Sequence, residues 1–584
     1  MILQALTRYY EDLRSRGEIA APGWAPAKIS FALCLNGDGE LTQVVPTMEE
    51  ALKGRKTVLQ PQVFSLPAAV GKTSGVASNF LWENSGYFLG VRQNQNIERS
   101  LLCFSAASSL HHKVLDNVNS PVAHAILSFF DTWDPEQAEN HPMIAPIYKE
   151  ITTGVNLLFR VNGCYPQDDL MIKKAWESFF MDSEEDAPYM QCLVTGKMEH
   201  IARVHPKIKG IVDPGSAITD KSLVSFNDIS EESYGCYKSQ GKNAPVGKYA
   251  AFAYTAALNH LLADKNNVQL IGDTTLVCWA EGADAAYPDF FSAVMSGGSY
   301  EGLSDNDLRA ALKRIAGGQP CDDLGVDPAR PFYILGLAPN AARLSVRFFL
   351  RDSFGKLMEN VNAHYERLEI VRPAYEKFNY LPLWAMLRET VNLNSRDKSP
   401  SPAMAGAAAR AVFSGTRYPA SLLEATMLRI RAERSITWGR AAIIKAYYLK
   451  NPHEDCPEEV LTVSLNEAST NPAYTLGRLF SVYEAVQQAA NPGINATIKD
   501  KYFNSAAAMP ASIFPVLNNL YQKHLRKLDA GQRVYYDKQV MALKGMLGES
   551  YPARMTLAQQ GAFDLGYYHQ TQKRYTKKEE NENV

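Results

Sequence analysis

A polar segment near the N-terminus carries residue types that hydrogen-bond to nucleic acids. Between residues 71 and 84 the candidate side chains are Lys72, Thr73, Ser74, Asn79 and Asn84. Ammonium and hydroxyl groups bond to phosphates, and side-chain amides can pair with base edges. Gly71 and Gly75 let the backbone come close to a ligand. Polar loops are also common where no ligand binds, so composition alone leaves both interpretations open.

The same segment is predicted to be a surface loop, and it does not match the nucleotide-binding motif that it partly resembles. Pro67 and the two glycines prevent a long helix or strand over residues 66–78, and regular structure resumes as a strand at 86–91. Val70-Gly71-Lys72-Thr73 is similar to the end of a Walker A loop. That loop needs a glycine five positions before Gly71, where Leu66 stands. We therefore predict no NTPase.

Catalytic groupings are scarce in the sequence. The best metal candidate is Cys192 with His200 and His205, which lacks a fourth ligand at a standard spacing. A metal-dependent nuclease built on these three residues is the alternative function. No CxxC pair, HD pair or GxSxG motif occurs. The sequence favours a binding protein with no catalytic residues, no metal and no cofactor.

A second polar pattern lies in the stretch 332–351. We expect a buried strand at 332–337, a turn at Pro339-Asn340, and a second strand. In that second strand, alternation places Arg343, Ser345 and Arg347 on one face and Leu344, Val346 and Phe348 on the other. Such a basic stripe can follow a phosphate backbone. Arginines paired with carboxylates on a solvated face are an equally good interpretation.

Length and composition bound the architecture. The chain has 584 residues, 46% hydrophobic and 21% charged, with a formal net charge of −2. This length predicts two to four domains, and the near-neutral charge excludes a histone-like polycation. Eight scattered cysteines favour a reducing cytoplasm. The N-terminal residues 1–16 form an amphipathic helix rather than a signal peptide, and no stretch predicts a membrane span.

Hydrophobic periodicity divides the chain into three regions. Residues 1–130 are predicted to be α+β, with a hairpin around Asn36-Gly37-Asp38-Gly39 and helices at 96–115 and 120–131, the first containing His111 and His112. Residues 131–374 are also α+β, with a helix at 247–262 and a strand at 273–281. Residues 375–584 form a helical bundle. Its predicted helices are 379–392, 402–414, 419–434, 437–449, 472–490, 510–528 and 531–547.

Five ordered blocks carry a resemblance to a known family. They are KTSGVASNFLWENSGYFLGV, QCLVTGKMEHIARVHPKIKG, SLVSFN with SYG and GKNAP, GLAPNAARLSVRFF, and YTLGRLFSVYEAVQQ. Their order over nearly the whole chain resembles the large subunit of type I-C CRISPR surveillance complexes (Cascade), which serve antiviral defence. The resemblance implies a non-catalytic protein that recognises the protospacer-adjacent motif (PAM) in duplex DNA and aids R-loop opening.

The resemblance also implies partners. These are the 5′ end of the guide RNA, the target duplex and its displaced strand, the backbone and guide-end subunits, small subunits, and the helicase-nuclease that cuts. No membrane is involved. Residues from about 460 onward resemble a small subunit, and we expect them to fold alone. No methionine lies between Met427 and Met509, so a separate product would need another start codon, such as one at Val460 or Val463.

The family's roles are carried onto individual residues of this chain. Motif reading falls on the loop 66–84, through Lys72, Thr73, Ser74, Asn79 and Asn84. Strand contact falls on Arg343 and Arg347, supported by Lys207 and Lys209 and, more weakly, by Ser225, Asn227, Lys242 and Asn243. The displaced strand is expected to lie along Lys499, Lys501, Lys523, Arg526 and Lys527 of the C-terminal helices.

Overall fold

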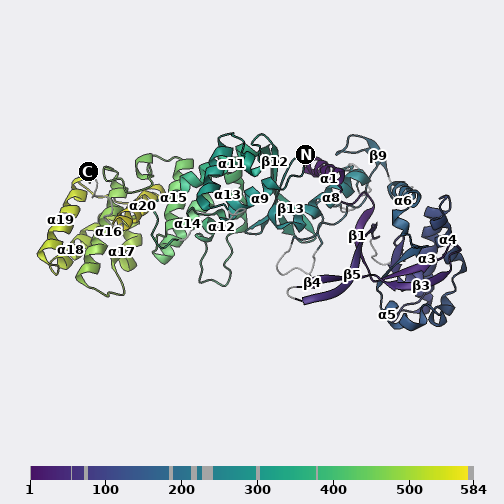
Figure 1. Ribbon diagram of the computed structural model, residues 1–584. Coiled ribbons are helices and arrows are strands. Elements are labelled where there is room, and N and C mark those ends of the chain that lie inside the picture. The colour runs from purple at the N-terminus through teal and green to yellow at the C-terminus, as the bar shows by residue number, and fades with distance from the viewer. Residues whose placement is uncertain are drawn as a thin grey trace. The chain divides into compact units, whose positions relative to one another are not determined.

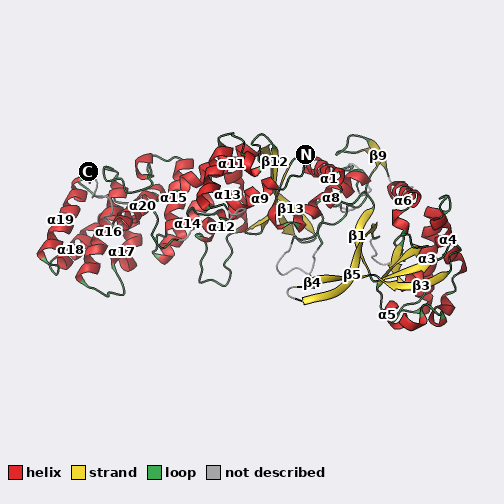
Figure 2. Cartoon of the chain, in the orientation of Figure 1, coloured by secondary structure: helices red, strands yellow, loops and turns green. Residues whose placement is uncertain are grey.

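The computed structural model confirms the predicted fold class (Figures 1 and 2). It describes residues 2–53, 56–70, 76–182, 188–211, 220–226, 241–297, 303–376 and 379–575. About 50% of the chain is helical and 17% is strand, and the strands are concentrated in the N-terminal and middle regions. From about residue 380 to residue 573 the described chain is helical. None of the described helices combines the length and apolarity needed to cross a membrane.

The chain forms two compact units. Unit 1 comprises Met1–Ile208 and Ser222–His260, and unit 2 comprises Lys209–Lys221 and Leu261–Val584. The finer division at residues 130 and 374 stays a prediction.

Unit 1 holds two sheets. In the first, the strand order is β3 (Leu41–Pro46), β2 (Phe31–Leu35), β7 (Asn156–Val161) and β6 (Trp82–Asn84). β2 and β3 form the predicted hairpin, whose turn is organised by the Asn36 side chain, which accepts hydrogen bonds from the Asp38 and Glu40 amides. The second sheet has the order β1 (Trp24–Ile29), β5 (Lys56–Pro67) and β4 (Met48–Lys53), and Figure 1 shows β4 and β5 as a long hairpin.

The helices of unit 1 are α1 (Ile2–Ser15), α2 (Ser85–Phe88), α3 (Ile97–Leu115), α4 (Pro121–Thr132), α5 (Tyr148–Ile151) and α6 (Leu170–Asp182), followed by the short strands β8 (Tyr189–Gln191) and β9 (Met198–His200) and by helix α8 (Lys248–Ala263). Among these helices, α2 and α4 pack on the first sheet, and α1 packs on α8 through Tyr10 and Phe252. The predicted helices at the N-terminus and at 96–115, 120–131 and 247–262 are confirmed. The strand predicted at 86–91 is wrong, because Asn84 caps a helix there by accepting from the Gly86 amide.

Unit 2 begins with an antiparallel sheet. Its order is β10 (Val268–Ile271), β11 (Thr274–Ala280), β12 (Pro331–Asn340) and β13 (Arg343–Ser353). Two helices lie between β11 and β12 in the chain, α9 (Ala286–Ser296) and α10 (Asp305–Ala316), and α11 (Phe354–Leu368) follows β13. β12 continues through Asn340, so the predicted turn at Pro339-Asn340 is placed too early. The chain reverses at Ala341, whose φ is +50°.

The predicted two-faced arrangement of β13 is wrong because the strand contains a bulge. Val346 pairs with Leu337 and Phe348 pairs with the adjacent Gly336, so Arg347 is an extra residue opposite β12. Val346 and Phe348 therefore point to opposite faces of the sheet. Their exposed fractions, 41% and 6%, agree with this.

Nine further helices complete unit 2 within its described residues. They are α12 (Leu383–Arg388), α13 (Pro402–Ser414), α14 (Ala420–Glu433), α15 (Trp438–Lys450), α16 (Pro472–Ala490), α17 (Ile498–Ala508), α18 (Pro510–Leu525), α19 (Ala530–Gly545) and α20 (Leu557–Lys573). Each of the seven predicted helices has a counterpart, although the one predicted at 379–392 is limited to α12, and α17 and α20 were missed. α16 and α20 cross closely, since an added Cβ at Gly477 would lie 2.0 Å from the Phe563 carbonyl oxygen.

Candidate nucleic-acid interface

The predicted motif-reading loop is held at its base by three hydrogen bonds. The Trp82 indole Nε1 donates to the Pro67 carbonyl oxygen at 2.7 Å, where β5 ends and β6 begins. Next to this contact, the Ala68 amide donates to the Gly23 carbonyl oxygen at 2.7 Å. One step further out, the Val70 amide donates to Asn79 Oδ1 at 2.9 Å. Lys72, Thr73 and Ser74, three of the predicted contacts, lie outside the described residues.

Asn79 and Asn84 are brought together by a residue that the sequence interpretation missed, Glu83. Asn79 Nδ2 donates to Glu83 Oε1 at 2.9 Å, and both the backbone amide and Nδ2 of Asn84 donate to Glu83 Oε2 at 2.8 Å. We call these three residues the amide–carboxylate cluster. Asn79 is 5% exposed and Glu83 is 2% exposed, so both lie in the protein interior, whereas Asn84 is half-buried. A buried carboxylate requires such donors.

The cluster defines what the two asparagines do in this structure. Both Asn79 amide atoms bond to protein partners, and Asn84 uses its oxygen as the cap of α2 and its nitrogen on Glu83. These contacts stabilise the end of the loop that leads into α2. The predicted role of Asn79 and Asn84 as direct DNA contacts stays a prediction. In the sequence, the only sign of this cluster was that one acidic residue, Glu83, lies between the two asparagines.

His111 supports the same loop from helix α3. Its Nε2 accepts from the Leu81 amide at 3.0 Å, so the ring proton is on Nδ1, which donates to the Ala107 carbonyl oxygen at 2.7 Å. Leu81 has a φ of +63°, which is unusual for a residue with a side chain. Burial lowers the pKa of His111 to about 4, only partly opposed by the Ala107 carbonyl. His111 is therefore uncharged near neutral pH, and its hydrogen bond stabilises the unusual backbone conformation at Leu81.

The candidates in the middle region lie in several environments. Lys207 is exposed and its Nζ donates to Ser222 Oγ at 2.7 Å, which ties two of the predicted segments together. Lys209 and Ser225 are exposed, whereas Lys242 and Asn243 are half-buried. Asn227 lies outside the described residues. The nucleic-acid roles of these six residues stay predictions.

The three candidate metal ligands do not form a metal site. Cys192 is buried and its sulfur accepts from the Gly247 amide at 3.2 Å. The His205 ring bonds to the Tyr254 hydroxyl at 2.7 Å, and burial lowers the pKa of His205 to about 4. His200 lies on β9 with its ring centre 5.3 Å from that of Tyr189. Among the residues that the structure describes, no group of three His, Cys, Asp or Glu could hold a metal ion.

The two strand arginines are exposed on β13. Arg347 Nη2 bonds to Asp273 Oδ2 at 3.0 Å, and both side chains are partly solvated. An ion pair on a solvated face was one of the two interpretations of this stripe. Arg343 lies opposite Asn340, next to the turn that ends β12. A pair this exposed contributes less than about 1 kcal/mol to folding.

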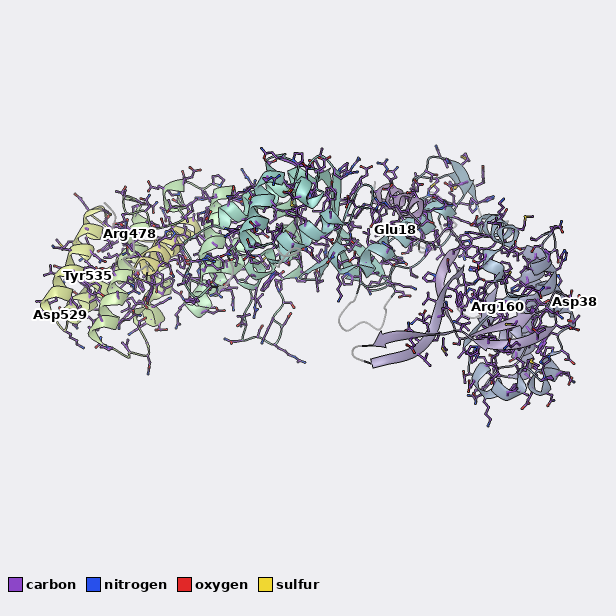
Figure 3. The ribbon with its side chains drawn as sticks, in the orientation of Figure 1. Glu18, Asp38, Arg160, Arg478, Asp529 and Tyr535 are labelled. Atoms are coloured by element: carbon purple, nitrogen blue, oxygen red, sulfur yellow. The ribbon has the colours of Figure 1, made fainter. Side chains whose placement is uncertain are left out.

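The C-terminal basic residues divide into one inward and four outward side chains. The Lys499 ammonium lies 4.7 Å from the Tyr567 ring centre, and burial lowers the pKa of Lys499. Lys501, Lys523, Arg526 and Lys527 are exposed, with Lys527 Nζ donating to Asn491 Oδ1 at 3.0 Å. Near the last three, Asp529 caps α19, and α19 presents Tyr535, both labelled in Figure 3. Lys499 is therefore the least accessible of the five.

One comparison with known proteins covers almost the entire chain. A family model described as "CRISPR-associated protein (Cas_Csd1)" matches residues 6–575. No curated protein sequence matches the chain. The matched span includes the amide–carboxylate cluster, both strand arginines and the C-terminal helices. The family assignment thus applies to both units.

Proposed function

The chain belongs to the Cas_Csd1 family of CRISPR-associated proteins, and on that premise we propose that it is the non-catalytic large subunit of a type I-C RNA-guided surveillance complex. The family match over residues 6–575 is the observation that carries this proposal. In such a complex, pairing with a guide RNA identifies the target, and a protein subunit recognises a short flanking motif in duplex DNA, as in Cas9-type recognition on an unrelated fold.

The loop 66–84 is the proposed motif reader of this subunit. Two bonds join the ends of the loop, from the Val70 amide to Asn79 and from Trp82 to Pro67, and Glu83 holds the Asn79 amide in place. A loop fixed at its base loses less conformational entropy when it binds DNA. We assign motif contact to Lys72, Thr73 and Ser74, and a positioning role to Asn79 and Asn84.

Two substitutions test this loop assignment in the reconstituted complex. Asn79→Ala should weaken binding of the correctly flanked duplex by roughly 1–3 kcal/mol while leaving assembly intact, whether a brace or a base contact is lost. Glu83→Gln separates the two causes. Its new amide would face the Asn84 donors and loosen the loop, yet Glu83 itself cannot reach a base. Motif discrimination is measured by competition between flanked and unflanked duplexes.

Each outcome of that pair has one meaning. Loss of discrimination in both variants supports bracing by the cluster. Loss in Asn79→Ala alone supports direct base reading by Asn79. If both variants discriminate as well as the unmodified protein, the loop is not the motif reader.

The remaining activities of the subunit are proposed from the family. It would contact the 5′ end of the guide RNA, help to open the duplex beside the motif, and recruit the helicase-nuclease. The purified chain should neither contain stoichiometric zinc or manganese nor cut DNA. Detection of both would replace this proposal with the nuclease alternative.

The C-terminal bundle is proposed to fold as a small-subunit-like module from about residue 460. α16 is surrounded chiefly by α17–α20, and a buried bond joins Tyr567 to Glu484 within the module. One face of α20 is covered from outside, where the Tyr568 hydroxyl donates to the Val371 carbonyl oxygen. The fragment 460–584 should show helical circular dichroism with a cooperative thermal transition. An unfolded spectrum would reject the module.

A further inference from the structure

A groove in unit 2 joins a predicted arginine to two arginines that sequence interpretation missed. It lies between strand β13 and helix α13 and has a cavity volume of about 390 Å³. Arg347 of β13, Arg410 of α13 and Arg417 of the segment after α13 all line it. We call it the arginine groove. Its three cationic side chains come from positions up to 70 residues apart in the sequence.

The charge of the groove is largely uncompensated. None of the residues that line it is Asp or Glu. Arg347 bonds to Asp273, which lies outside the lining, through one guanidinium nitrogen. Arg410 and Arg417 are exposed, and within the described part of the chain neither guanidinium has an ion pair or a hydrogen bond. Such a recess concentrates positive potential.

The α13 side of the groove carries small apolar residues. Ala403, Gly406, Ala407 and Arg410 are spaced at i, i+3, i+4 and i+7 on α13, so they share one helix face. No bulky side chain from these positions obstructs the space in front of Arg410. A ligand with charged groups along one edge and apolar surface along the other would match this lining.

We propose that the arginine groove binds the phosphodiester backbone of a single-stranded nucleic acid. The guanidinium fork fits two phosphate oxygens at once, and the apolar wall accommodates sugars. A recess of this size admits one strand, whereas a duplex presents its phosphates on a convex surface. The inference rests on the proposed function for the presence of nucleic acid, and it adds a specific binding site.

The test uses the full-length chain and fluorescently labelled single strands of DNA and of RNA with the same sequence. The double variant Arg410→Gln/Arg417→Gln should bind on the order of tenfold more weakly for each lost contact. Its plot of log affinity against log salt should be shallower by about 1.4, because each phosphate contact to a single strand contributes about 0.7. Thermal unfolding should not change, since both side chains are exposed.

A matched control and a second design keep the result specific. Arg388→Gln/Arg554→Gln removes two exposed arginines outside the groove and should leave affinity and salt dependence near those of the unmodified chain. Ala407→Glu places an acid on the groove wall while all three arginines stay in place, and it should also weaken binding. The strand type whose affinity falls, DNA or RNA, identifies the natural occupant.

Three outcomes would overturn or limit the inference. Unchanged affinity and salt slope in the double variant and in Ala407→Glu would exclude the groove as a strand site. Equal weakening in the Arg388/Arg554 control would show that binding depends on the total positive charge of the chain, and it would also reject the groove. If the groove variants bind normally while the reconstituted complex still recognises its motif, the groove is wrong and the proposed function stands.

Discussion

The amide–carboxylate cluster of unit 1 and the arginine groove of unit 2 use polar side chains in opposite ways. In the cluster, Asn79 and Glu83 are nearly inaccessible and satisfy each other's hydrogen bonds. In the groove, Arg410 and Arg417 are exposed and have no protein partner among the described residues. The difference is the one expected between a group that shapes a backbone and a group that awaits a charged ligand.

This contrast predicts where a substitution will be felt. A change in the cluster should alter stability and loop order first, and DNA recognition only as a consequence. A change in the groove should alter affinity and salt dependence while stability stays the same. A groove variant that unfolds, or a cluster variant that changes affinity without changing stability, would contradict this assignment of roles.

The largest expected effect is that of Glu83→Ala. It removes the acceptor of three hydrogen bonds and leaves donors of the buried Asn79 and the half-buried Asn84 unmet, so unit 1 should lose about 3 kcal/mol or more of unfolding free energy. Hydrogen exchange should speed up at the Val70 and Asn84 amides. Glu139→Ala, at an exposed position, is the control and should change neither quantity. Unchanged exchange at Val70 would show that the cluster does not hold the loop.

Acid should also destabilise the loop through His111, which lies next to the cluster. His111 has an ordinary pKa of 6.5 when unfolded and about 4 when folded, so its contribution to stability is complete above pH 6.5 and is lost as pH falls toward 4. The loss should be about 2 kcal/mol at pH 5. Urea unfolding across this range measures it. Arginines do not titrate there, so groove affinity should not follow the same curve.

The variant His111→Phe isolates this contribution from the other buried histidines. His205, His364 and His569 also have pKa values lowered by burial and add their own acid sensitivity. His111→Phe keeps an aromatic ring among Phe80, Phe88 and Phe130 but leaves the Leu81 amide without an acceptor. It should cost about 1–3 kcal/mol at neutral pH and flatten the pH dependence. An unchanged slope would assign the acid effect elsewhere.

A smaller effect is expected for the helix cap. Asn84→Ala removes both the cap of α2 and a donor to Glu83, and should cost about 1 kcal/mol. Asn84→Ser retains a capping oxygen but not the amide donor, so its cost measures the Glu83 contact alone. Chemical denaturation of the two variants gives both values. Equal costs would mean that the cap contributes nothing.

The two regions also differ in how far the sequence could predict them. The β2–β3 hairpin and seven C-terminal helices follow from local periodicity and turn chemistry, and these predictions are confirmed. α20 was missed because it is buried over consecutive positions and carries Gly566 against α16 and Gly561 against α15, so it lacks a polar face. Local patterns cannot show packing of this kind.

The site residues illustrate the same limit. The segment around Asn79 was identified by residue type, but Glu83 became visible as the centre of the cluster only when burial and contacts were known. The bulge at Arg347 broke the alternation on which the two-faced strand was predicted. Arg410 and Arg417 join Arg347 through tertiary packing across more than 60 residues. No local pattern encodes that approach.

The smallest expected effect concerns Asp273, the one carboxylate among the described residues that bonds to a groove arginine. Asp273→Asn should leave stability within about 1 kcal/mol, since the pair is solvated, and should free Arg347 for a ligand. Single-strand affinity should then rise a few-fold. Arg347→Ala should do the reverse, weakening all sequences about equally and lowering the salt slope by about 0.7.

These two variants decide whether Asp273 competes with the strand or orients Arg347 for it. Competition predicts opposite changes in affinity, because the carboxylate and a phosphate would share one guanidinium. Orientation predicts that both variants bind more weakly, with Arg347→Ala the worse. In either case the two changes should depend on salt, whereas Glu83→Ala should not, because its bonds are buried. Equal salt dependence in all three would remove the distinction between a structural cluster and a binding groove.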